Sequence, residues 1–296
     1  MKRYFWRLAL MVVAVVVIFA LYRRLTISSP PATPFLQSSY PLTIAHRGGA
    51  ALAPENTLLA FESALKFGAD VLEVDVRATA DGVLVAFYDE TVDRTTGATG
   101  KVAEMTLAQV QALDAGYAYS PDNGATFPYR GQGINVPTVR EIGEKFPQAR
   151  LSLKIRQVTP PIEAPLIALI QEMKAQNRIL VTSVDEETMK RFRHLDPAIA
   201  TGAADDEVRD FYFWQRWGIS YFYRPVASVL DVPDRWGDVQ LITAGFVNAA
   251  HAQGMKIYVR SINTPERMRE LLNLKVDGIV TDRPDLLRQV VVEAGY

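Results

Sequence analysis

The chain has 296 residues, of which 49% are hydrophobic, so it can bury one large core or two small ones. Its 32 Lys and Arg residues nearly balance 33 Asp and Glu residues, and this balance argues against nucleic acid as a partner. The sequence contains no cysteine, which excludes disulfides, thiolate metal sites and cysteine nucleophiles.

Residues 1–26 are predicted to form an N-terminal membrane anchor. Residues 4–22 are apolar except for Arg7, and as a helix they would be about 28 Å long, just enough to span a bilayer. A cleaved secretory signal is the alternative, but Arg23 and Arg24 follow the run directly and no small-x-small cleavage site adjoins it. The positive charges before the run slightly outweigh those after it. We therefore expect a single-pass protein of the cell membrane, with its folded domain on the extracytoplasmic side.

Residues 27–41 form a Ser/Pro-rich spacer, and the remaining 255 residues, 42–296, match the ~250 of a (β/α)8 barrel. Short apolar runs recur as candidate buried strands, with helical patterns between most of them. This alternation predicts an α/β fold with a parallel sheet, a TIM barrel. The eight predicted strands are 42–45, 71–76, 151–155, 179–182, 199–202, 219–223, 256–259 and 278–281.

The clearest predicted helix follows the first strand. Leu58, Phe61 and Leu65 share one helical face, Asn56 is a candidate N-cap, and Gly68 is a candidate stop.

Two segments fall outside the simple strand and helix alternation. Residues 83–87 are a ninth strand candidate, set off by Asp81 and Gly82, and are predicted to form a hairpin beside the barrel mouth. Residues 114–133 are predicted to be a short irregular insertion.

Polar residues follow the predicted strands at the end where a barrel of this kind places its active site. His46 and Arg47 follow the first strand, and this pair combines proton transfer with a bidentate grip on phosphate. A lone histidine is more often structural, but Glu73 and Asp75 stand two apart on the second strand and so face the same side. Carboxylates inside a barrel need a cation, either a metal ion or a basic side chain.

Five motifs, in this order, resemble the glycerophosphodiester phosphodiesterase family over residues 42–290. They are His-Arg-Gly from residue 46, Pro-Glu-Asn-Thr from 54, Glu-x-Asp from 73, Asp-x-Thr-x-Asp-Arg-Thr-Thr from 89 and Asp-Gly-Ile-Val-Thr-Asp-Arg-Pro from 277. The resemblance implies a (β/α)8 barrel that hydrolyses glycerophosphodiesters to an alcohol and glycerol 3-phosphate, assisted by calcium or magnesium. It also implies that His46 is one of two acid/base histidines, that Arg47 clamps the phosphate, and that Glu55, Glu73 and Asp75 surround the metal.

The chain departs from the family pattern at three places. Tyr88 stands where the family has its second histidine, and a phenol is poorly matched to proton transfer at neutral pH. Lys154 and Arg156 replace a Glu-x-Lys motif, and Arg260 begins the pair that replaces a Trp-Thr motif. An ammonium at Lys154 repels a metal ion, so we expect Lys154 to take the metal's place. Arg156 and Arg260, with Arg47, remain candidate phosphate-binding residues.

Two classes of function follow from these residues. The first is a weakened hydrolase acting on glycerophosphodiesters or lysophospholipid-like molecules, with His46 and Tyr88 at its catalytic positions. The second is a catalytically degenerate barrel that binds phosphate-containing ligands as a membrane-tethered sensor or scaffold. A phosphoinositide phospholipase is a more distant alternative. His194 and His251, the other histidines, lie in predicted surface helices and are expected to be structural.

Aromatic residues gather between positions 211 and 223, and two interpretations of them stay open. They favour a core position, with an exposed lipid-facing surface as the alternative. The residues are Phe211, Tyr212, Phe213, Trp214, Trp217, Tyr221, Phe222 and Tyr223.

Overall fold

A computed structural model of the chain describes residues 30–296 and, before them, residues 4, 6, 7, 10, 11, 14, 15, 17–19, 22 and 25. The predicted anchor over residues 1–26 therefore lies mostly outside the described residues. Among the residues that are described, no helix has both the length and the apolar character needed to cross a bilayer.

Eight parallel strands form the predicted barrel, in the order β6-β5-β4-β2-β1-β11-β10-β7. A parallel bridge between Gly202 and Val229 joins the two ends of this sheet. The predicted (β/α)8 barrel is thus confirmed. The strands are β1 (Leu42–Ala45), β2 (Val71–Ala78), β4 (Arg150–Ile155), β5 (Ile179–Thr182), β6 (Ala200–Thr201), β7 (Val229–Pro233), β10 (Lys256–Arg260) and β11 (Gly278–Thr281).

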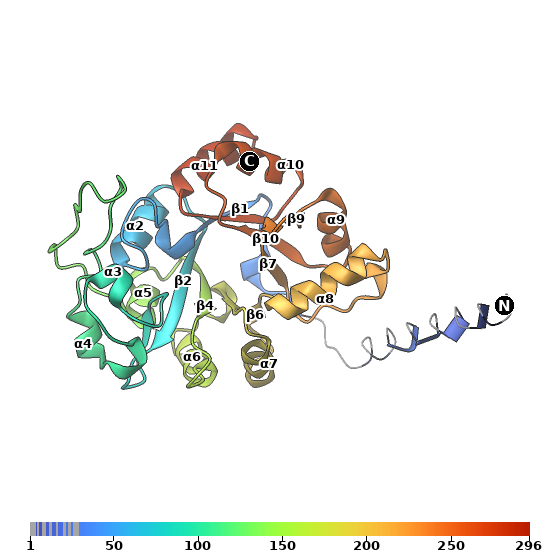
Figure 1. Ribbon diagram of the computed structural model, residues 1–296, viewed down its shortest axis with the longest axis horizontal. Helices are drawn as coiled ribbons and strands as arrows, with labels where there is room; N and C mark the ends of the chain where they lie inside the picture. The colour runs from blue at the N-terminus through green and yellow to red at the C-terminus, as the bar shows by residue number, and fades with distance from the viewer. Residues whose placement is uncertain are drawn as a thin grey trace.

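Helices surround the strands, as Figure 1 shows. The longer ones are α2 (Leu58–Lys66), α5 (Val139–Lys145), α6 (Glu163–Glu172), α7 (Glu186–Leu195), α8 (Asp205–Arg216), α9 (Ala244–Ala252), α10 (Pro265–Asn273) and α11 (Pro284–Glu293). Shorter elements are η1 (Pro34–Leu36), η2 (His46–Gly48), α3 (Asp93–Thr96), η3 (Val102–Glu104), α4 (Leu107–Gln111), η4 (Gln176–Arg178), η5 (Ser220–Phe222), β8 (Arg235–Trp236) and β9 (Val239–Gln240).

The predicted hairpin and insertion are both present. Strand β3 (Leu84–Ala86) pairs with β2 in an antiparallel register. Between α4 and α5, residues 114–133 form turns and bends without a helix or strand.

Helix α2 begins one residue later than the predicted cap. Thr57, not Asn56, is the N-cap, because its side chain accepts a hydrogen bond from the backbone N–H of Ala60. Asn56 has a left-handed backbone, with φ of 56°, and its side chain is used in the barrel mouth instead. Gly68, with φ of 84°, follows the helix as predicted.

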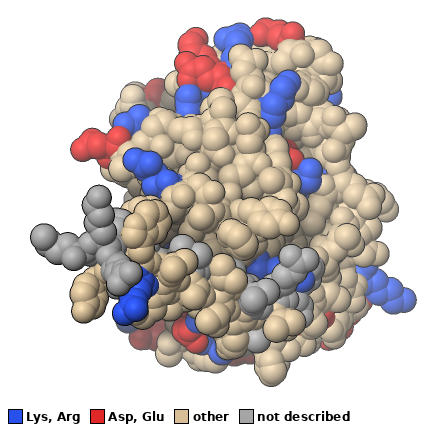
Figure 2. All heavy atoms as spheres, turned by 90° about the vertical axis from the view of Figure 1, so that its right-hand side faces the viewer, with Lys and Arg blue, Asp and Glu red and all other residues tan. Residues whose placement is uncertain are grey.

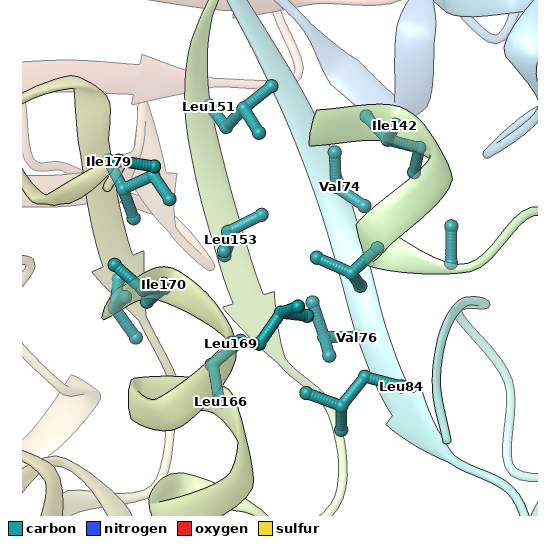
Figure 3. Packing of buried hydrophobic residues seen from close by; sticks show 14 of the residues in the cluster. Val74, Val76, Leu84, Ile142, Leu151, Leu153, Leu166, Leu169, Ile170 and Ile179 are labelled. Atoms are coloured by element: carbon teal, nitrogen blue, oxygen red, sulfur yellow. The ribbon is translucent and has the colours of Figure 1, made fainter. Parts of the chain in front are cut away.

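The alternation of residues along the strands separates an outer core from the barrel interior. Val74 and Val76 of β2 pack with Leu153 of β4 against the surrounding helices, as Figure 3 shows. Glu73 and Asp75 take the other face, as the period of two requires. At the base, which we define as the end where the parallel strands begin, Phe35 of η1 is fully buried among interior residues such as Ile44. The fully buried Phe35 shows that part of the predicted spacer packs into the barrel.

The predicted strand at residues 219–223 is wrong. This stretch contains the 3-10 helix η5, and the sixth barrel strand is β7. The aromatic residues give the sequence pattern of a buried strand, but Tyr221 and Phe222 are exposed. The true strand was missed because Asp231 interrupts its apolar run, and this carboxylate faces Lys154 rather than the helices.

Candidate active site

The loop after β1 places His46 and Arg47 at the barrel mouth, which we define as the end where the parallel strands finish. The backbone turns sharply here, with φ of 51° at Arg47 and 86° at Gly48. A Cβ on Gly48 would lie 2.8 Å from the Cβ of Ala60, so only glycine lets this loop pack against α2.

His46 is oriented by a carboxylate from the opposite end of the chain. The distance from His46 Nδ1 to Asp282 Oδ1 is 2.6 Å, and Asn263 Nδ2 donates to Asp282 Oδ2 at 2.7 Å. Burial works to raise the pKa of Asp282, but the hydrogen bond and charge of His46 and the donor from Asn263 outweigh it and lower that pKa. An ionised Asp282 accepts the Nδ1 proton, which leaves Nε2 of His46 to act on a substrate.

Glu73 lies close to His46, and one of its carboxylate oxygens has no hydrogen-bond donor among the described residues. That oxygen, Oε1, is 3.7 Å from His46 Nε2. This oxygen can stabilise a proton that His46 gains.

The carboxylate of Asp75 is fully buried, and two guanidinium groups and one side-chain amide contact it. Arg156 Nε lies 2.5 Å from Oδ1, while Arg47 Nε lies 3.2 Å and Asn56 Nδ2 3.0 Å from Oδ2. Burial works to raise the pKa of Asp75, but Arg156, Arg47 and Asn56 together lower it. Both oxygens of Asp75 are therefore occupied by side chains.

Glu55 is held in the same way at the rim of the mouth. Arg47 Nη1 donates to Oε1 at 2.9 Å, and Arg94 donates to both carboxylate oxygens, at 2.6 Å and 3.0 Å. Arg94 also contacts Asp89. The Glu55 carboxylate is thus bound by two guanidinium groups.

Lys154 joins two carboxylates inside the barrel. Its buried ammonium lies 2.9 Å from Asp231 Oδ2 and 3.4 Å from Glu73 Oε2. Burial works to raise the pKa of Asp231, but Lys154 and then Arg260, whose Nε is 3.7 Å from Oδ1, outweigh it and lower that pKa. The acidic and basic residues of β2 and β4 meet as the sequence predicts, with Arg156 on Asp75 and Lys154 on Glu73.

The carboxylates expected around a metal do not fit a divalent cation here. Glu55, Glu73 and Asp75 each lie against at least one basic side chain. Within residues 30–296 and the described positions before them, no group of three or more His, Cys, Asp or Glu side chains is arranged to hold a metal ion. The charge that a metal would supply comes from Lys154 and the arginines.

Tyr88, after β3, lies among three guanidinium groups. The guanidinium carbon is 3.5 Å from the ring centroid for Arg47, 4.4 Å for Arg156 and 5.8 Å for Arg94. The ring face attracts these cations and partly offsets their mutual repulsion. Tyr88 is therefore placed to position arginines.

Six residues of this arrangement were not among the predicted site residues: Asn56, Asp89, Arg94, Asp231, Asn263 and Asp282. Four of them, all but Asp231 and Asn263, lie inside the motifs quoted above, so their motifs were the available signal. For Asp231 the only signal is the presence of an acidic residue within an apolar run, Val-Leu-Asp-Val. His194 lies exposed on α7, and His251 on α9 contacts Asp277 at 2.7 Å, away from the mouth.

Comparison with known proteins agrees with this fold. A sequence profile of the glycerophosphoryl diester phosphodiesterase family matches residues 46–286. A glycerophosphodiester phosphodiesterase from Caldanaerobacter subterraneus is 31% identical over 264 residues, which cover 86% of this chain and 99% of that protein.

Two solved structures are similar across most of their length. The glycerophosphodiester phosphodiesterase of Agrobacterium tumefaciens has a TM-score of 0.68 and 28% identity, covering 83% of this chain and 98% of the other. An Oleispira antarctica phosphodiesterase, solved with its product sn-glycerol-3-phosphate, has a TM-score of 0.67 and 25% identity, covering 86% and 97%. The chain belongs to the glycerophosphoryl diester phosphodiesterase family.

Proposed function

We propose that this protein hydrolyses glycerophosphodiesters to an alcohol and glycerol 3-phosphate without a divalent cation, using His46 as its one acid/base histidine. The observation that carries the proposal is the His46 and Asp282 pair, set at the barrel mouth beside Arg47. The similar Oleispira antarctica enzyme, bound to sn-glycerol-3-phosphate, supports this substrate class.

His46 transfers the proton in this mechanism. Asp282 fixes the ring, and Nε2 takes a proton from the attacking water molecule as the new P–O bond forms. Attacking and leaving oxygens lie roughly in line through phosphorus, so His46 assists one of them. The leaving oxygen takes its proton from water, because Tyr88 is stacked on the arginines. We therefore expect slow turnover.

Basic side chains bind the phosphate and stabilise its developing charge. Arg47 and Arg156 both contact the Tyr88 ring, and a guanidinium can form paired hydrogen bonds with phosphate oxygens. Arg260 borders the same mouth beside Asp231. Lys154 and Arg260 together balance the charges of Glu73 and Asp231, so the carboxylates do not repel the substrate.

The test is an assay of the full chain with glycerophosphocholine, with EDTA or with added calcium or magnesium. We expect slow release of glycerol 3-phosphate that EDTA does not abolish. Phosphate binding without any release would favour the sensor or scaffold function, and release that requires calcium or magnesium would contradict the metal-free site.

Divalent cations are expected to leave the melting temperature of the wild-type protein unchanged, since Lys154 already neutralises Glu73. Lys154→Glu should gain a saturable, cation-dependent rise in melting temperature, because a ligand bound only to the folded state stabilises it. Thermal unfolding across a calcium and magnesium titration measures both. A saturable rise in the wild type that Glu73→Ala abolishes would show a true metal site.

We also propose that residues 1–26 anchor the protein in the cell membrane with the barrel on the extracytoplasmic side. The apolar run and its flanking charges support this proposal. A reporter fused after residue 26 is expected to lie outside the cytoplasm, and the mature protein should keep its N-terminal peptide. A mature N-terminus near residue 30, or a reporter active in the cytoplasm, would refute it.

A further inference from the structure

Four large aromatic side chains are exposed close together in sequence at the end of α8 and in η5. We call them the basal aromatic patch: Phe213, Trp217, Tyr221 and Phe222, with exposures of 54%, 77%, 77% and 42%. Their neighbours Phe211, Trp214 and Tyr223 are buried in the core. The aromatic segment therefore serves both predicted purposes, part core and part exposed surface.

The basal aromatic patch lies at the base of the barrel, opposite His46. Helix α8 begins at the mouth, where Asp205 is 3.7 Å from Arg260, and it runs back toward the start of β7. The patch follows at the end of this helix and precedes β7. Figure 2, viewed from the side of α8 and α9, shows a surface that is mostly uncharged.

The N-terminal segment reaches the barrel beside this patch. Pro30 and Pro31 line a hollow of about 980 Å³ together with Tyr221 and Phe222. Phe35, five residues beyond Pro30, is buried inside the barrel and fixes the chain there. Since an extended chain spans at most ~3.6 Å per residue, residues 25 to 30 cover no more than about 18 Å.

We propose that the basal aromatic patch inserts into the headgroup region of the bilayer that the N-terminal segment enters. Aromatic rings prefer this region, where one side is apolar and the other wet. The short connection keeps the base of the barrel within reach of the membrane. Arg216, exposed on the last turn of α8, is in no ion pair among the described residues, so its charge is available to anionic lipid. The inference rests on the proposed anchor and is independent of the proposed hydrolysis.

The test uses single cysteines, because the chain has none of its own. A nitroxide spin label is placed in Trp217→Cys and, separately, in Phe222→Cys, in the full chain reconstituted into phosphatidylcholine vesicles with and without phosphatidylglycerol. The matched control is Val158→Cys, which is 46% exposed but follows β4 at the mouth.

We expect labels in the patch to become more accessible to oxygen and less accessible to a water-soluble nickel chelate, while the Val158→Cys label stays accessible to the chelate. Phosphatidylglycerol should increase the depth of the patch labels in the bilayer, and Arg216→Glu should remove that increase. If the protein floats with the vesicles but the patch labels are as accessible to the chelate as the control label, this proposal alone is overturned. Protein that fails to float would overturn the anchor as well. Dipolar broadening between patch labels would identify a second copy of the chain as the occupant and would overturn the proposal.

Discussion

Lys154→Ala is expected to lower the free energy of unfolding by about 3–5 kcal/mol. The substitution removes the buried ammonium that lies 2.9 Å from Asp231 and 3.4 Å from Glu73. Each buried carboxylate then loses a charge partner, and desolvation is no longer offset. Equilibrium unfolding in urea measures the change.

Lys190→Ala is the matched control for this prediction. Lys190 also contacts two carboxylates, Glu186 at 3.1 Å and Glu187 at 2.9 Å, but on the exposed surface of α7. Its removal should cost far less than that of Lys154, because solvent screens an exposed ion pair. Adding Asp231→Asn to Lys154→Ala should recover part of the loss, because it removes one unpaired charge. Equal losses for Lys154→Ala and Lys190→Ala would show that the buried cluster does not depend on Lys154.

His46→Gln is expected to lower kcat/KM for glycerophosphodiesters by ~10²–10⁴-fold, the range that a general acid or base contributes. Asp282→Asn should cost less, because His46 keeps a hydrogen-bonding partner at Nδ1 but loses the negative charge that faces it. Steady-state kinetics as a function of pH measure both. The melting temperature of each variant checks that the fold persists.

Tyr88→Phe separates the two roles that Tyr88 can have. The substitution keeps the ring on which Arg47 and Arg156 stack and removes only the hydroxyl. We expect activity close to that of the wild type. A loss as large as that of His46→Gln would show that the phenol acts as the missing acid, contrary to the proposed mechanism.

The sequence predicts the barrel well where a strand is purely apolar or where acidic residues alternate with apolar residues along it. The alternation at Glu73 and Asp75 assigned both inward faces correctly, because side chains on a strand have a period of two. It failed at the sixth strand, where an exposed aromatic segment carries no charged residue and β7 contains Asp231. Propensity cannot tell that Tyr221 faces outward and that Asp231 faces a lysine.

The candidate site was less predictable than the fold, since its contacts join distant parts of the chain. His46 and Asp282 are 236 residues apart, and no local pattern pairs them. The stacking of Arg47 and Arg156 on Tyr88 likewise brings together three separate loops. Motif order identified most of these residues, but their partners depend on tertiary geometry.

In the orientation proposed above, the course of α8 from the barrel mouth to its base sets the height of the reaction above the lipid surface. Most of the barrel strands have four to six residues, and at about 3.3 Å per residue they separate the two ends by roughly 13–20 Å. With its base on the membrane, the protein holds His46 out in the water at that height. A lysophospholipid would have to leave the bilayer to reach it, whereas a fully deacylated glycerophosphodiester diffuses in freely. The proposed orientation therefore predicts a preference for water-soluble fragments of lipids over the lipids themselves.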